Sequence, residues 1–311
     1  MLYGGIGAER EVSLQSGTCV ADALREADFD VVEFDIRPDR LDILADATVD
    51  VFFPVLHGEF GEDGQLQQIL ESAAAGSLVY TGSGPQASRL AFDKLAAKKL
   101  FARAGVATPA CIIFDPAADA AEFERKLDGF ADKYVVKPVR QGSSVGISIV
   151  SEPGQAIDAA RKTAREYRDC FIEKFVAGRE LTVGILCGRA LPIIEIRPKS
   201  AFYDYHAKYV DDRTEFVFGT TDAATTAKVQ AAAMRCFDVL GCRDFARVDF
   251  ILADDGTPYA LEVNTIPGFT SHSLLPKAAM QAGFSISHAC AMIVRSALAR
   301  KKVGSSEQAR A

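Results

Sequence analysis

The chain has 311 residues, of which 49% are hydrophobic and 25% are charged, and its formal net charge is −7 at pH 7. This length exceeds one ordinary domain, so two or three domains are expected. The negative charge argues against a general nucleic-acid binder, which needs a basic face, but it leaves room for a local basic pocket that binds a small polyanion.

The first third of the chain alternates short apolar runs with helical patterns, which is typical of a parallel α/β unit. Strands are predicted at residues 31–36, 49–57 and 77–82, and helices at about 11–27 and 64–75. The opening MLYGG is short for a first strand, so part of that strand is expected to be missing. The stretch TGSGPQAS, rich in Gly, Ser and Pro, ends this first domain, which is predicted as 1–84.

Two further domains are predicted beyond this boundary. An amphipathic helix in DKLAAKKLFARAGVATP is followed by strands in CIIFD, YVVKPV, GISIV and CFIEKFV and by a helix at about 154–167. Together they predict a small α+β domain, bounded as 85–178. The third domain, 179–311, contains the apolar segments ELTVGILCG and ALPIIEIRP, a helix at about 221–239, a hairpin and two closing helices.

The seven cysteines form no Cys-x-x-Cys pair and no cluster with histidine. Their spacing predicts buried thiols in a reducing cytosol rather than a disulfide framework or a zinc site. No apolar run in the sequence approaches the roughly 20 residues of a membrane span, and the first residues do not resemble a signal peptide. A cytoplasmic protein is therefore expected.

The stretch RVDFILADDGTPYALEVN (247–264) predicts two strands joined by a tight turn. If residues 255–256 are the centre of a two-residue type I′ turn, Asp249 lies directly opposite Glu262, and the two ends of the stretch face each other. Two carboxylates that face each other repel, and a hard divalent cation such as Mg²⁺ would relieve the repulsion. The alternatives are a solvent-facing hairpin with scattered charge, or a one-residue slip that puts the acids on opposite faces.

The stretch YVVKPVRQGSSVGISIV places Lys137 near the end of a strand, before a loop rich in Gly and Ser. Gly142 and Gly146 let the backbone approach a ligand, and the loop amides with the hydroxyls of Ser143 and Ser144 can donate to phosphate oxygens. Because a strand follows, this is not a Walker loop, which leads into a helix. Alone it fits an ordinary hairpin; together with the acidic hairpin it predicts an ATP site.

This order of parts resembles the ATP-grasp superfamily. Seven successive motifs, spread over nearly the whole chain, are similar to those of the D-alanine–D-alanine ligase family: GAEREVSLQSG, LHGEFGEDG, YTGSG, DKLAAK, KPVRQGSSVG, YDYHAKY and EVNTIPGFTSHSLLP. The resemblance implies an α/β (α+β, multidomain) chain with the ATP-grasp fold and an N-terminal Rossmann-like parallel α/β domain. It also implies ATP-dependent ligation of two D-alanine molecules through an acyl phosphate, for peptidoglycan synthesis.

The resemblance implies a role for each matching residue. Those matched to ATP binding are Lys94, Lys137, Ser144, Glu173, Lys174, Val176, Glu180 and Lys208. Those matched to two magnesium ions, for which Mn²⁺ is an alternative, are Asp249, Glu262 and Asn264. Those matched to catalysis are Glu9, Ser143, Tyr209 and Arg247, and those matched to substrate binding are His57, Gly268, Ser273 and Leu274.

In this scheme Glu9 fixes the amino group of the first D-alanine, with Ser143 and Tyr209 linked to it. Arg247 stabilises the transferring phosphoryl group, although the same residue alone fits a salt bridge to one of the nearby acids. His57 fits a hydrogen-bonded structural residue as well as a substrate contact. The stretch SAFYDYHAKYVDD predicts a lid that excludes water from the acyl phosphate.

Three other functions fit parts of the sequence. A related ligase could join D-alanine to another second substrate such as D-serine, and a catalytically silent ATP-binding protein could keep the fold. The set Arg247, Asp249, Glu262 and Asn264 argues against the silent protein, since a mere binder needs no transition-state charge. A dinucleotide oxidoreductase is disfavoured because GGIGAERE lacks the last glycine of the Rossmann fingerprint. The expected partners are ATP and D-alanine, without nucleic acid or membrane, and the resemblance implies a homodimer.

Overall fold

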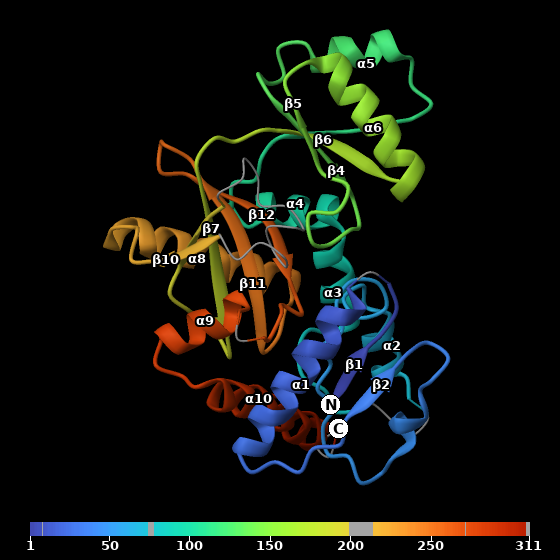
Figure 1. Ribbon diagram of the computed structural model, residues 1–311, viewed down its shortest axis with the longest axis vertical. Helices are drawn as coiled ribbons and strands as arrows, with labels where there is room; N and C mark the ends of the chain where they lie inside the picture. The colour runs from blue at the N-terminus through green and yellow to red at the C-terminus, as the bar shows by residue number, and fades with distance from the viewer. Residues whose placement is uncertain (8, 74–77, 199–213, 271, 309–311) are drawn as a thin grey trace.

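The computed structural model describes residues 1–7, 9–73, 78–198, 214–270 and 272–308. The described residues form a small parallel sheet and two larger antiparallel sheets, one of four strands and one of six. Figure 1 shows the four-stranded sheet at one end, the six-stranded sheet in the middle and the N-terminal part beside it, with the last helix lying next to the first.

The N-terminal part is built on the parallel sheet. Strand β1 (Leu2–Gly4) pairs along its whole length with β2 (Phe34–Ile36). Helix α1 (Arg10–Glu26) packs against β1, and the 3-10 helix η1 (Asp42–Ala45) and α2 (Gln65–Glu71) follow. The short opening stretch therefore does supply a strand.

Two strands predicted further along are reduced to single parallel bridges. Leu2 bridges Pro54, and Phe52 bridges Tyr80, so four chain segments lie parallel. Pro54 has no N–H to donate in the middle of its run, which interrupts the ladder. The predicted parallel order is confirmed and the predicted length of the segment around Pro54 is wrong; residue 77 of the other segment lies outside the described residues.

The four-stranded sheet confirms the strands predicted in the middle of the chain. Its strands are β3 (Cys111–Ile113), β4 (Tyr134–Pro138), β5 (Ser148–Val150) and β6 (Cys170–Lys174), in the order β3-β6-β4-β5. Helix α6 (Pro153–Tyr167) packs against β4 and β6, and α5 (Ala120–Leu127) packs against α6. These helices cover one face of the sheet and leave the other toward the six-stranded sheet (Figure 1).

The six-stranded sheet is covered by helices on both faces. Its strands are β7 (Arg179–Leu186), β8 (Arg189–Ala190), β9 (Ile194–Arg197), β10 (Glu215–Phe218), β11 (Phe245–Leu252) and β12 (Pro258–Asn264). The order is β10-β9-β7-β11-β12, with β8 paired to β7. Helices α3 (Pro85–Phe92), α4 (Lys94–Arg103) and α8 (Ala223–Leu240) pack near β12, and α9 (Leu274–Gln281) packs on β7 with α10 (Ile286–Gln308) beside it.

The side chains of β7 alternate between the two faces of the six-stranded sheet and so contribute to two hydrophobic clusters. Leu181, Val183 and Ile185 belong to the cluster under α4 and α8, whereas Leu186 belongs to the cluster under α9 and α10. Side chains two residues apart share a face of a strand, so this pattern separates the two cores. The predicted domain bounds stay a prediction; α3 and α4 pack against α8 and β12 rather than standing apart from the large sheet.

The hairpin of β11 and β12 has the predicted register near its acids, but its turn differs from the predicted one. The predicted two-residue turn is wrong: Ala253 donates its N–H to the carbonyl oxygen of Thr257 at 3.0 Å, which closes a loop of three residues. Gly256, at φ 76°, takes the left-handed position that such loops favour. The longer loop shifts the pairing by one residue, so that Leu252 faces Pro258.

A β-bulge then corrects this shift. The register changes between Asp249 and Phe250, and Leu261 is the extra residue on β12. Beyond the bulge, Asp249 faces Glu262, and the ends of the stretch, Arg247 and Asn264, face each other. The predicted pairing of the two acids is therefore confirmed, although the predicted two-residue turn is wrong.

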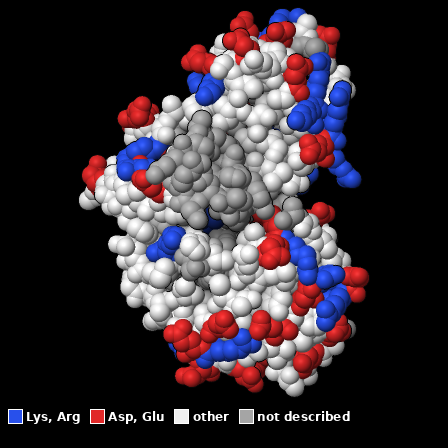
Figure 2. Space-filling model, viewed as in Figure 1, with Lys and Arg blue, Asp and Glu red and all other residues white. Residues whose placement is uncertain are grey.

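Charged side chains of both signs are interspersed on the surface. On the face in Figure 2, the described Lys and Arg residues lie among Asp and Glu, over the N-terminal part as well as the four-stranded sheet. Among the described residues, no single helix is long and apolar enough to cross a membrane. Helix α9 with the 286–300 part of α10 meets that test only as a pair bent by 101°.

Asp244 joins three parts of the chain just before β11. Its buried carboxylate accepts from the N–H of Gly82 at 2.8 Å, from the hydroxyl of Ser296 at 2.8 Å and from the guanidinium of Arg300. Arg300 also donates to the carbonyl oxygen of Tyr80 at 2.9 Å. The N-terminal part, the start of β11 and α10 are thereby held together.

We expect Asp244→Asn to lower the free energy of unfolding by about 2 kcal/mol, because a buried hydrogen bond to a charged group is lost. Asparagine tolerates the left-handed backbone of residue 244, at φ 59°, so the change removes charge without backbone strain. Urea unfolding would measure the effect. Asp238→Asn, at an exposed position of α8, is the control and should change stability by no more than about 0.5 kcal/mol. Equal stability of both variants would contradict the role of Asp244.

Candidate active site

Three adjoining pockets lie where the two antiparallel sheets meet the N-terminal part. Gln141 lines all three; Lys94 and Glu262 line the first two; Glu9 and His57 line the third. The three pockets therefore form a row with shared lining residues, from the space between the sheets to Glu9 just before α1.

The first pocket collects most residues matched to ATP binding. Its lining includes Lys94, Lys137, Ser144, Glu173, Lys174, Val176 and Glu180. Val135, Ile149, Ile251 and Leu261 give it apolar walls from both sheets, as a planar base requires. Lys208 lies outside the described residues.

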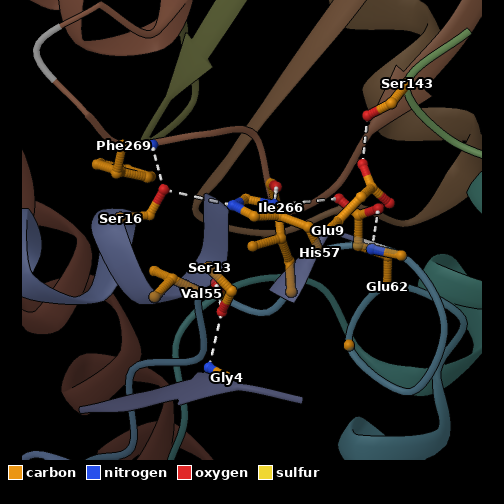
Figure 3. Close-up of polar contacts among 12 residues, drawn as sticks. Gly4, Glu9, Ser13, Ser16, Val55, His57, Glu62, Ser143, Ile266 and Phe269 are labelled. Carbon is orange, nitrogen blue, oxygen red and sulfur yellow. Dashed lines mark hydrogen bonds and ion pairs between the residues drawn. The ribbon is translucent and has the colours of Figure 1, made fainter. Parts of the chain in front are cut away.

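The Gly/Ser loop has an unusual backbone. Ser143 and Ser144 have φ values of 51° and 59°, in the left-handed region that residues other than glycine rarely adopt. Such conformations cluster at ligand-binding sites. Ser143 donates its hydroxyl hydrogen to Oε1 of Glu9, which lies just before α1. Figure 3 shows this link between two distant parts of the chain. Tyr209, the third matched member, lies outside the described residues.

The acids of the hairpin are each paired with a cation. Arg247 donates from Nε to Oδ1 of Asp249 at 2.9 Å and from its second terminal nitrogen to Oδ2 at 2.8 Å. Thr182, directly opposite on β7, donates to Oδ1 at 2.6 Å. The Nζ of Lys94 lies 3.1 Å from Oε2 of Glu262. The predicted repulsion between the two carboxylates is thus relieved by two side chains of the chain itself.

Asn264 extends this network toward the N-terminal part. In the amide orientation that satisfies its neighbours, it donates to Oε1 of Glu62 at 3.0 Å and accepts from Arg247 at 2.9 Å. Glu62 is buried and also accepts from the N–H of Gly58 at 3.0 Å. The predicted oxygen ligands Asp249, Glu262 and Asn264 therefore lie on one connected surface.

His57 links α1 to the segment after β12 (Figure 3). Its Nδ1 lies 2.9 Å from the carbonyl oxygen of Ile266, and its Nε2 lies 3.4 Å from the hydroxyl of Ser16. Because a carbonyl can only accept, Nδ1 donates, and Ser16 donates to Nε2 in the neutral ring. Ser16 in turn accepts from the N–H of Phe269 at 3.3 Å. Both ring nitrogens thus have protein partners, while the residue still lines the third pocket.

The segment matched to the second substrate is folded tightly on itself. The hydroxyl of Ser273 accepts from the N–H of Thr270 at 3.0 Å, and Ser273 is the residue before α9. A Cβ on Gly268 would lie 2.7 Å from that hydroxyl, so glycine leaves it room. Leu274 is 8% exposed and packs in the core under α9.

A carboxylate shared by two lysines lies in the wall of the first pocket. Glu173 is 2% exposed; its Oε2 lies 2.5 Å from Nζ of Lys137, and its Oε1 accepts from Nζ of Lys98. Burial alone would raise the pKa of Glu173, but the ammonium groups of Lys137 and Lys98 outweigh it and hold the pKa below its ordinary value. Burial lowers the pKa of Lys98, against the opposing effect of Glu173.

Three residues of this network were missed from the sequence. Lys98 follows Lys94 by four positions, so helical spacing puts both on one face of α4 and could have indicated it. Glu62 lies within the quoted motif LHGEFGEDG, but nothing marks it among the acids there. Thr182 faces Asp249 only because β7 pairs with β11, which local sequence does not show.

Comparisons with known proteins agree with this arrangement. Residues 100–295 match the family described as the C-terminal part of D-alanine–D-alanine ligase. The D-alanine–D-alanine ligase of Syntrophotalea carbinolica is 42% identical over 304 residues, which cover 97% of this chain and 96% of the relative. That of Methylacidiphilum infernorum is 40% identical with the same coverage.

Solved structures give the same result. D-alanine–D-alanine ligase from Bacillus anthracis has a TM-score of 0.84 at 33% identity, covering 97% of this chain and 98% of that one. Its complex with ATP has a TM-score of 0.83 at 33% identity, covering 97% of both chains. VanG D-Ala:D-Ser ligase from Enterococcus faecalis has a TM-score of 0.81 at 30% identity, covering 95% of this chain and 98% of that one. The ATP-grasp fold implied by the motif order is confirmed, and the chain belongs to the D-alanine–D-alanine ligase family.

Proposed function

We propose that this protein joins two D-alanine molecules into D-alanyl-D-alanine, with conversion of ATP to ADP and phosphate, for peptidoglycan synthesis. The observation that carries the proposal is the row of three pockets with shared lining residues, from the pocket between the sheets, past the paired acids of the hairpin, to Glu9 and His57. Relatives with the corresponding name, 42% and 40% identical over nearly the whole chain, support it.

The reaction has two steps. One carboxylate oxygen of the first D-alanine bonds to the γ-phosphorus of ATP, the bond from that phosphorus to the β–γ bridging oxygen breaks, and ADP leaves. The amine nitrogen of the second D-alanine then bonds to the acyl carbon and loses a proton, while the carbon–oxygen bond to phosphate breaks. A carboxylate is a poor electrophile, so the first step is needed to create a leaving group. Catalysis then rests on positioning and charge neutralisation.

Lys94 and Lys137 would bind the nucleotide phosphates, with Ser144 donating to phosphate oxygens. The residues of the adenine and ribose segment are Glu173, Lys174, Val176 and Glu180, and Lys208 would reach a phosphate. All of these except Lys208 line one pocket, which supports the assignment.

The oxygen ligands Asp249, Glu262 and Asn264 fit Mg²⁺, because two opposed carboxylates and an amide form a hard donor set beside the same pocket. They would hold two Mg²⁺ ions, or Mn²⁺, which when bound neutralise charge on the phosphates. Arg247 and Lys94 now pair with these acids, and each would turn to the phosphates in the nucleotide complex. Arg247 would then stabilise the transferring phosphoryl group.

The two amino-acid substrates would bind near the third pocket of this row and the segment after β12. Glu9 would fix the amino group of the first D-alanine, oriented by Ser143 and by Tyr209. His57 lines that pocket and positions the segment of the second substrate. Gly268, Ser273 and Leu274 form that segment, where the N–H groups at the start of α9 would bind a carboxylate.

The favoured second substrate is D-alanine rather than D-serine. The similar structure named for D-Ala:D-Ser ligation is 30% identical, whereas the relatives named for D-alanine alone reach 43%. A catalytically silent ATP-binding protein is disfavoured, since the set Arg247, Asp249, Glu262 and Asn264 is brought together and a mere binder needs no transition-state charge. Competition between the two amines would decide the second substrate.

We further propose a cytoplasmic homodimer whose partners are small molecules, with no nucleic-acid or membrane partner. The net charge of −7 and the mixed charges in Figure 2 support this choice of partners. The bounds 1–84, 85–178 and 179–311 are proposed as its domains.

The function is tested by phosphate release in the presence of ATP, Mg²⁺ and D-alanine, with L-alanine and no amino acid as controls. We expect release that depends on D-alanine and a dipeptide product identified by mass. ATP binding without release, under any of these conditions, would favour the silent protein instead.

Arg247→Ala should reduce kcat by about 10²- to 10³-fold, because a preorganised cation at the transferring group is lost. The ATP dissociation constant should change by no more than about threefold, since Arg247 acts mainly on the transition state. Steady-state kinetics and calorimetric ATP binding measure the two quantities. Arg235→Ala, at an exposed position of α8, is the matched control. Near-normal turnover of Arg247→Ala would remove its proposed role.

Glu262→Gln should raise the Mg²⁺ concentration for half-maximal activity by roughly tenfold, because a charged ligand becomes a neutral one. Mn²⁺ binding to the ATP-loaded protein, followed by electron paramagnetic resonance, should weaken in parallel. Asp254→Asn removes an exposed carboxylate in the turn of the same hairpin and should leave both quantities unchanged. An unchanged metal requirement for Glu262→Gln would exclude Glu262 as a ligand.

A further inference from the structure

Lys98 lies behind the wall of the nucleotide pocket. Lys137 and Glu173 are among the described residues that line the first pocket, and Lys98 is not. The side chain of Lys98 is 6% exposed and is fixed by Glu173 and by the hydroxyl of Thr108, at 2.8 Å. It therefore has no direct access to a nucleotide, and the assigned ATP contacts do not explain it.

The lining of the first pocket contains more acidic than basic side chains. The described lining contains three lysines, Lys94, Lys137 and Lys174, and four acids, Glu173, Glu180, Asp249 and Glu262, so its acids outnumber its lysines by one. A nucleotide triphosphate is a polyanion, so this lining alone is unsuited to it. Lys98, which lies behind this lining and pairs with Glu173, offsets one of these acids.

The effect of Lys98 on the pocket passes through the carboxylate of Glu173. Its two carboxylate oxygens are divided between two ammonium groups, Oε1 to Lys98 and Oε2 to Lys137. Two positive charges and one negative charge leave this triad at +1. Without Lys98, the single carboxylate would pair fully with Lys137 and cancel its charge toward the pocket.

We propose that Lys98 is a positioning residue of the ATP site, which takes up one side of the Glu173 carboxylate and so leaves the Lys137 ammonium available to the nucleotide phosphates. The inference rests on the proposed ATP-dependent function, and it assigns the Glu173 side chain to the lysines rather than to the nucleotide.

Lys98→Met tests the inference. Calorimetric ATP binding should weaken by roughly tenfold to a hundredfold, the effect of one unit charge near the phosphates at low effective dielectric. The KM for ATP should rise in parallel while kcat at saturating ATP stays within about threefold, as for an interaction made equally in ground and transition states. Lys99→Met, at the neighbouring exposed position of α4, is the control, and Lys98→Arg should keep near-normal affinity.

The double variant Lys98→Met with Glu173→Gln separates charge from structure. It leaves Lys137 beside a neutral amide, which restores the +1 of the triad, so ATP affinity should recover to within about threefold of the wild type. If Lys98 only supported packing, the second substitution would weaken binding further. Thermal unfolding of each variant checks that the fold is retained.

Three results would overturn the inference, and they differ in what else they affect. If the wild type binds ATP and Lys98→Met binds it equally well, or the double variant binds more weakly than Lys98→Met, the inference falls and the proposed function stands. If the wild type itself does not bind ATP, the proposed function falls and the inference falls with it.

Discussion

The site depends on two carboxylates held side by side, Asp249 and Glu262, which face each other across β11 and β12. Left alone they would repel, and the chain meets each with a cation from a different place. Arg247 comes from the same strand as Asp249, and Lys94 is the first residue of α4. The charges of the hairpin therefore also join α4 to the large sheet, and the same two cations lie beside the pocket where phosphates would bind.

This pairing requires a register that the turn does not supply. The three-residue loop would place Asp249 opposite Leu261, and because side chains alternate, the two acids would then lie on opposite faces. The bulge at Leu261 prevents this, and both Leu261 and Glu262 line the first pocket. One extra residue thus adds an apolar side chain to the pocket wall and keeps Glu262 opposite Asp249, in keeping with the use of bulges to aim side chains near active sites.

Much of this was predictable, because the chemistry is concentrated in local stretches. Lys137 with its Gly/Ser loop, and the acids of the hairpin, can be read from alternation and turn residues alone. The predicted strand around Pro54 is too long, because an apolar run shows where a strand can form but not how many of its N–H groups find partners. Thr182 and Glu62 were missed because their contacts depend on which distant segments become neighbours. Lys208 and Tyr209 stay predictions.

The buried triad of Glu173 is poorly explained by stability. Removing charged groups from water costs free energy. A protein in which well-packed hydrophobic side chains replace a buried ion pair is often as stable as the original, or more stable. Lys98, Lys137 and Glu173 are all nearly buried, at 6%, 9% and 2% exposure, so the cost applies to each of them. A function compensates for that cost if the triad keeps a net positive charge beside the phosphates. The carboxylate of Glu173 then orients the ammonium group of Lys137. Lys98 pairs with the other oxygen of that carboxylate, so the charge of Lys137 is not fully neutralised.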